Sequence, residues 1–153
     1  MNILEILDSG RDGGAAAALA RSFNVDPKAA EAVLESIVPE LTQRIERNTL
    51  NRGGIADLTV ALGHAAERSY LDNPAYLDTP EGRQEGIAYL DQILWSKDRS
   101  RAIAHRAAAT SGVSEATVKQ MLPVVAAMMM GGLAKGAGGS LSDILSKIPG
   151  LPG

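Results

Sequence analysis

Cysteine is absent from the 153-residue sequence, and aromatic residues are scarce, with one Phe, three Tyr and one Trp. Without cysteine the chain has no disulfide, thiolate metal ligand or cysteine nucleophile, and it suits a reducing compartment. The shortage of aromatic residues argues against a β-sandwich or barrel, whose strands favour β-branched and aromatic side chains. What remains is a helical protein without thiol chemistry.

Alanine dominates the apolar residues, with 24 copies in the sequence. Ala, Leu and Met are strong helix formers, so the composition predicts an all-α fold. Apolar residues at helical spacing predict a compact bundle of about six or seven short helices with two αα corners. We assign residues 1–135 to a single helical domain and residues 136–153 to a glycine-rich tail with one short helix.

No targeting or membrane-spanning segment is expected. The first residues lack the basic region of a signal peptide. The longest nearly unbroken apolar run, 121–133, spans about 20 Å as a helix, which is short of the roughly 30 Å hydrocarbon core. We therefore expect a cytoplasmic protein without a membrane span.

Helix boundaries are clear in the N-terminal third. Asn24 suits the left-handed conformation that ends a helix, and Asp26 with Pro27 is typical of the start of the next one. Pro39 lies inside that second helix, so we expect a kink there or a break near Val38.

The segment 72–86 is the strongest predicted loop, because Pro, Asp, Gly and Asn are frequent in it. Tyr70 and Tyr76 each begin a short motif that ends in proline, and we interpret the two motifs as similar turns. Before this loop, Asp57 is expected to cap a helix that runs to about Ser69.

One pattern occurs twice. The turn at 24–26 followed by Pro39 has a counterpart at 112–114 followed by Pro123, which defines candidate pseudo-repeats at 12–48 and 98–134. Either a duplication or two corners that need the same turn chemistry explains the match.

Residues 98–122 resemble a helix-turn-helix element, in which Gly112 supplies a positive φ, Val113 fills the inter-helix core and Ser114 caps the second helix. Beyond residue 120 the second helix is apolar on every side, so only its first turn or two could enter a DNA groove. The structural alternative is an αα corner. If the element binds DNA, the expected contacts are Lys97, Arg99, Arg101, Arg106, Ser114, Lys119 and Gln120.

The methionine-rich part of this helix has two interpretations. A helix that is apolar all round is buried in its own protein or in a partner, and methionine suits both irregular cores and adaptable surfaces. It is therefore either a central core helix or a surface for self-association or a protein partner. The residues of that surface are Met121, Val125, Met128, Met129 and Met130.

No catalytic residue, metal site or cofactor is predicted. His64 and His105 have no partner placed by the sequence, and we interpret His64 as part of a solvated helix turn with Glu67 and Arg68. His105 lies among arginines, which favours a phosphate contact or plain surface. The acidic residues of the 72–86 segment do not have the spacing of a calcium loop.

Motifs across most of the chain resemble the uncharacterised bacterial YidB-like family, a domain of unknown function. The motifs are the glycines at 13–14, the turns at 24–27 and 112–113, and the segments 38–41, 85–86, 93–94, 96–102, 121–123 and 131–139. The resemblance implies an all-helical fold with a homeodomain-like or helix-turn-helix-like element, and no established activity. Trp95 departs from the pattern because the family tends to have a small residue there, and 64–82 looks peculiar to this chain.

These patterns favour a non-enzymatic helical module that acts by protein–protein contact, through a protein partner or through self-association. The alternative is a DNA-binding regulator that uses residues 98–122. A third hypothesis places a small-molecule site at the 70–86 segment and requires a concave pocket lined by His64, Tyr70, Asp72 or Tyr76.

Overall fold

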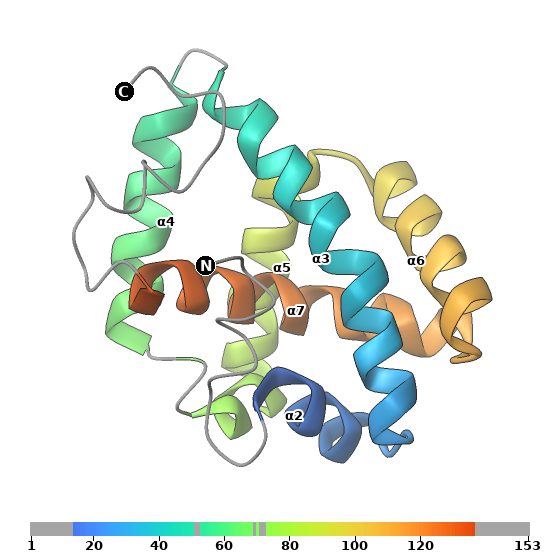
Figure 1. Cartoon of the computed structure of the whole chain (residues 1–153). Coiled ribbons are helices and arrows are strands. Elements are labelled where there is room, and N and C mark those ends of the chain that lie inside the picture. Colours follow the sequence, from blue (N-terminus) through green and yellow to red (C-terminus); the bar gives the residue numbers. More distant parts are fainter. Residues whose placement is uncertain (1–13, 51–52, 69, 71–72, 137–153) are drawn as a thin grey trace.

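Helix α7, which spans Glu115–Gly136, runs through the middle of the fold with the other helices around it (Figure 1). The computed structural model describes residues 14–50, 53–68, 70 and 73–136. All residues from 124 to 134 are buried. Helix α7 packs most extensively against α5 (Pro80–Leu94), and it also contacts α4 (Gly54–Arg68) and α6 (Lys97–Ser111).

The remaining elements are two helices near the N-terminal end of the described chain and one short helix before α5. Helix α2 (Gly14–Phe23) packs on the long helix α3 (Pro27–Thr49), and a short 3-10 helix, η2 (Pro74–Asp78), precedes α5. Within the described ranges there are six α-helices, one 3-10 helix and no strand, which confirms the predicted all-α bundle.

The predicted turn chemistry is present at both αα corners. Asn24 has φ 54°, and the Asp26 carboxylate accepts a hydrogen bond from the Lys28 amide at the start of α3. At the second corner Gly112 has φ 80°, and the Ser114 hydroxyl accepts from the Thr117 amide at 3.2 Å. Both corners therefore consist of a left-handed residue followed by an N-cap.

A third turn has the same construction between α5 and α6. Trp95 ends α5 with φ 62°, and the Ser96 side chain caps α6 by accepting from the Arg99 amide. The positive φ explains why a glycine would be the usual residue at position 95. This third turn lies outside the two corners that define the candidate pseudo-repeats. The same turn chemistry therefore also occurs without a repeat, and a duplication is not needed to explain it.

Three predicted boundaries are wrong. Of the kink or break expected at Pro39, the break near Val38 is absent: α3 continues through the proline, because the apolar stripe on both sides of it is buried. Helix α4 begins at Gly54, so Asp57 lies within its first turn and does not cap it. The loop predicted at 72–86 is largely helical, since its described part contains η2 and the first two turns of α5.

The core is built around the methionine-rich face of α7. Met121, Val125, Met128, Met129 and Met130 are at most 1% exposed, so they lie in the core and present no open surface. Residues 115–134 are long and apolar enough to span a membrane, but 72% of the most apolar window is buried inside the protein. This span is longer than the apolar run at 121–133 because it also includes the more polar residues 115–120. The short helix predicted in the tail lies outside the described residues.

Candidate functional site

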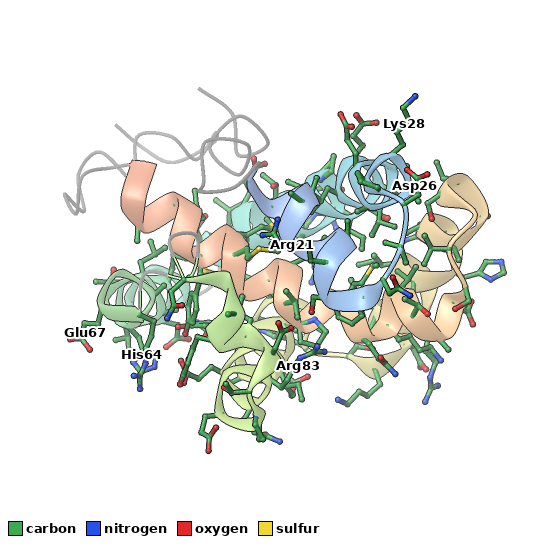
Figure 2. The ribbon with its side chains drawn as sticks, turned by 90° about the horizontal axis from the view of Figure 1, so that it is seen from below. Arg21, Asp26, Lys28, His64, Glu67 and Arg83 are labelled. Carbon is green, nitrogen blue, oxygen red and sulfur yellow. The ribbon has the colours of Figure 1, made fainter. Side chains whose placement is uncertain are left out.

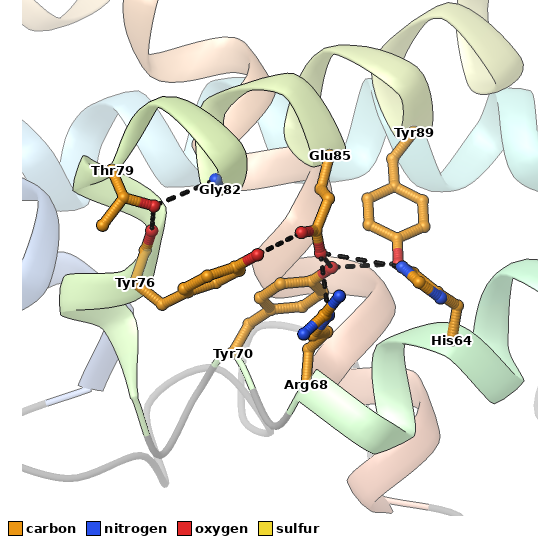
Figure 3. A network of polar contacts seen from close by, with 8 residues as sticks. All are labelled: His64, Arg68, Tyr70, Tyr76, Thr79, Gly82, Glu85 and Tyr89. Atoms are coloured by element: carbon orange, nitrogen blue, oxygen red, sulfur yellow. Dashed lines mark hydrogen bonds and ion pairs between the residues drawn. The ribbon is translucent and has the colours of Figure 1, made fainter.

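All three tyrosines of the chain converge on one carboxylate, that of Glu85 on α5 (Figure 3). The Tyr70 hydroxyl donates to Oε1 of Glu85 at 2.6 Å, and the Tyr76 hydroxyl donates to Oε2. The Tyr89 hydroxyl lies 3.1 Å from that of Tyr70. We call these four residues, with His64 and Arg68 of α4, the Glu85 cluster.

Two basic side chains from α4 complete the cluster. Arg68 Nε lies 3.3 Å from Oε1 of Glu85, and His64 Nε2 lies 3.7 Å from the same oxygen. The Arg68 guanidinium also covers the ring of Tyr76 at 5.5 Å. The cluster therefore ties α4, η2 and α5 together. Thr79 fixes the start of α5 beside it, because its hydroxyl accepts from the Gly82 amide at 3.1 Å.

The pKa shifts in the cluster favour a structural role. Burial alone would raise the pKa of Glu85, but hydrogen bonds from Tyr70 and Tyr76 and the charge of Arg68 lower it below its ordinary value. Burial, and then the bonds to Glu85 and Tyr89, raise the pKa of Tyr70. At neutral pH the carboxylate stays ionised and the hydroxyls stay protonated. General acid or base catalysis instead favours a pKa close to the working pH.

The sequence interpretation missed this cluster. His64 and Arg68 face α5 rather than forming only a solvated turn, and the repeated tyrosines do more than begin two similar turns. The repeat at Tyr70 and Tyr76 was the available signal, since each supplies one hydroxyl to one oxygen of Glu85. His105 likewise contacts a glutamate, with Nδ1 2.9 Å from Glu115 Oε1.

A groove of about 300 Å³ lies between α5, α6 and α7. Its apolar lining comes from α5 and α7, and its polar rim comes mainly from α6. We call it the basic groove. Its lining residues are Ile87, Leu90, Asp91, Lys97, Ser100, Arg101, Lys119, Leu122 and Pro123. A second, much smaller cavity of about 30 Å³ lies beside Trp95. Neither is lined by a residue of the Glu85 cluster, so neither provides the pocket that the small-molecule hypothesis requires.

The close approach of α5 and α7 positions this groove. Gly86 permits it, because an added Cβ would lie only 2.5 Å from the Pro123 carbonyl oxygen. Leu90 and Leu122 are buried at the base, while Ile87 and Pro123 are partly exposed. The groove thus has an apolar floor that water and ligands reach.

The predicted DNA contacts do not form one face. Lys97, Arg101 and Lys119 line the basic groove. Arg99 and Arg106 lie on the other side of α6, where Arg106 pairs with Glu40 of α3. The remaining two stay near the start of α7: Ser114 is the N-cap, and Gln120 is exposed. Of the seven predicted contacts, the structure therefore brings together Lys97, Arg101 and Lys119.

Within the described ranges, no group of three His, Asp or Glu side chains is arranged to hold a metal ion. Taken together, the fold and these sites describe a small all-α protein with a basic groove beside a buried core helix. The chain belongs to a bacterial protein family of unknown function, DUF937, whose model matches residues 5–136. This confirms the resemblance to an uncharacterised bacterial family. No curated protein and no solved structure matches the chain.

Proposed function

We propose that this protein is a non-enzymatic binding module whose basic groove docks an acidic, amphipathic segment of a protein partner. The observation that carries the proposal is the combination of an apolar floor with a rim of three cations in one groove. The groove, and not the methionine-rich part of α7, is the binding surface in this proposal, because the methionine side chains lie in the core.

The floor suits apolar side chains of a partner. Ile87 and Pro123 are partly exposed at the surface of the groove, above the buried Leu90 and Leu122. A volume of about 300 Å³ is at the lower end of ligand pockets, which range over about 300–1,000 Å³. It therefore accepts a few side chains from one face of a helix, as helix-in-groove recognition requires.

The rim suits carboxylates. It holds Lys97, Arg101 and Lys119 against one acidic residue, Asp91. Lys119 is exposed and, among the described residues, has no ion-pair partner. The charge balance of the groove thus favours an acidic partner over a basic one.

The existing ion pairs of the rim exchange easily. Lys97 pairs with Asp91 at 3.5 Å, and Arg101 pairs with Asp98 at 3.1 Å. All four side chains are more than half exposed, with fractions from 57% to 90%. Because exposed pairs contribute little to stability, carboxylates of a partner replace the internal ones at small cost.

A DNA duplex is the competing ligand, supported by the left-handed turn and N-cap at 112–114. Against it, α7 is buried from Met121 onward, and Arg106 already pairs with Glu40. The basic groove is also floored by apolar side chains, which phosphate backbones do not need. We therefore favour the protein partner.

Fluorescence anisotropy tests the proposal with a designed helical peptide of about 14 residues, or four turns. Leucines occupy one face of this peptide and glutamates flank it. The whole protein is expected to bind it and to bind a lysine-for-glutamate peptide far more weakly. Equal binding of the two peptides, or binding of a DNA duplex without binding of the glutamate peptide, contradicts the proposal.

Charge reversals locate the binding. K119E and R101E should each weaken the glutamate peptide by about three- to tenfold, as expected for a rim charge. K28E is the matched control, because Lys28 is exposed at the start of α3 and does not line the groove. Figure 2 shows Lys28 well apart from Arg83 of α5, the helix that forms one wall of the groove. K28E should leave the affinity unchanged. If K119E binds the peptide as well as K28E does, the groove is not the docking site.

A further inference from the structure

Helices α3 and α6 run antiparallel along one side of the molecule (Figure 1). An ion pair between Glu40 and Arg106 joins them partway along both helices. Arg99 precedes Arg106 by seven residues, or about two turns, so it faces the part of α3 that lies after Glu40. That part of α3 carries Arg44 and Arg47, which are three residues apart and therefore neighbours on the helix surface.

Arg44 lies close enough to Arg47 and Arg99 for their charges to act on it. Among the described residues, none of them forms an ion pair, because Glu40 is taken by Arg106 and Asp98 by Arg101. Burial, and then the charges of Arg99 and Arg47, lower the pKa of Arg44 below its ordinary value. The charge of this cluster is thus not balanced within the described chain.

The hydrogen-bonding groups of the cluster are also incompletely used. The Nε–H group of Arg44 is buried and has no acceptor. Arg99 donates from Nη1 to the Leu94 carbonyl at 2.8 Å, which caps the end of α5 and orients its guanidinium. The guanidinium of Arg99 is therefore held in place, and Arg44 and Arg47 bring further N–H donors toward it from α3.

We propose that Arg44, Arg47 and Arg99 form a binding site for a phosphoryl group. Guanidinium groups match the oxygen geometry of phosphate with paired hydrogen bonds, and a phosphate dianion balances more than one of the three charges. The group is supplied either by a soluble phosphate ester or by a phospholipid headgroup. The site is independent of the basic groove, because Arg99 projects from the opposite side of α6 to Lys97 and Arg101.

Thermal unfolding of the whole protein in phosphate, compared with chloride at equal ionic strength, tests this site. Phosphate stabilises proteins in general, so the informative quantity is the difference between variants. The wild type and the control K28Q, at an exposed lysine of the same helix α3 that lies in neither site, should show the same rise in Tm. R44Q and R47Q should lose the excess over the general effect, with phosphate affinity reduced about tenfold.

Two features keep the test interpretable. Arg47 is exposed, so R47Q should fold as the wild type does. R44Q should be no less stable than the wild type in chloride, because it removes a partly buried and repelled charge. Trp95, the only tryptophan, follows Leu94, so its fluorescence provides a second readout beside Arg99. An equal phosphate response in R47Q and K28Q overturns the proposal.

Vesicle sedimentation separates the two sources of phosphate. Phosphatidylcholine vesicles are compared with vesicles that also contain phosphatidic acid. Binding only to the latter, and its loss in R47Q, assigns a lipid headgroup. A phosphate response without vesicle binding assigns a soluble ester. The absence of a site-dependent response in both experiments contradicts the site.

Discussion

Tyr70 donates a 2.6 Å hydrogen bond to Oε1 of Glu85, and the ring that carries this hydroxyl is fully buried. The same side chain packs on Gly131 of α7, where an added Cβ would lie 3.3 Å from the Tyr70 Cβ. Tyr70 therefore connects the core helix to the helix that forms one wall of the basic groove. We expect the Glu85 cluster to stabilise the fold that holds the groove open.

Removing the Tyr70 hydroxyl should destabilise the protein. Y70F leaves a mostly buried carboxylate with one donor fewer, which costs about 1–3 kcal/mol in the free energy of unfolding. Urea denaturation at neutral pH measures this loss. The peptide affinity of the folded variant should be unchanged, and a stability equal to that of the wild type would show that the bond contributes nothing.

The contribution of Glu85 should depend on pH. The folded state lowers the pKa of Glu85 below its ordinary value of 4.5, so the ionised side chain stabilises the fold above pH 4.5. This stabilisation is lost as the pH falls through the folded pKa. The stability difference between the wild type and E85Q should therefore be largest near neutral pH and shrink in acid. A difference that grows in acid contradicts the interpretation.

Two glycine substitutions should have opposite effects. G86A places a Cβ against the Pro123 carbonyl, so it should separate α5 from α7 and cost at least about 1–3 kcal/mol, as overpacking does. G63A is the control within an exposed part of α4, where nothing lies within 4 Å of the added Cβ. It should stabilise the protein by up to about 1 kcal/mol. Equal Tm values for both variants would rule out a tight α5–α7 contact.

Met129 should behave as a core residue. Because the side chain is fully buried, M129A should lower stability by about 2–5 kcal/mol. Chemical denaturation at several protein concentrations is the measurement, since a subunit interface makes the midpoint depend on concentration. We expect the same loss at every concentration. A loss that disappears at high concentration would instead place Met129 in an interface between copies.

The helical secondary structure and the residues of the turns could be predicted from the sequence, because both depend on residues that are close in the chain. Asn24, Gly112 and Ser114 act at the turns where they stand. The prediction of a loop at 72–86 is wrong for the opposite reason. Its Pro and Asp residues suit helix starts as well as loops, and packing on α7 decides between them. Composition also could not decide whether the methionines face a core or a partner.

The sites depend on contacts between distant residues, so only part of each could be predicted from the sequence. Lys119 and Arg101 were named as cations, but their meeting in one groove depends on how α6 crosses α7. Arg99 and Arg101 look like one basic patch in the sequence, but a spacing of two residues places them on opposite sides of a helix. Arg44 was not singled out, because its cluster exists only where α3 meets α6.

Amide chemical-shift mapping of the whole protein with the glutamate peptide is the most direct test of the central claim, that the basic groove is a docking site. If the groove docks the peptide, the largest shifts occur at 87–91, 97–101 and 119–123, with little change at the exposed start of α3. Saturable shifts confined to another surface, or no shifts at peptide concentrations that saturate binding in anisotropy, would contradict it.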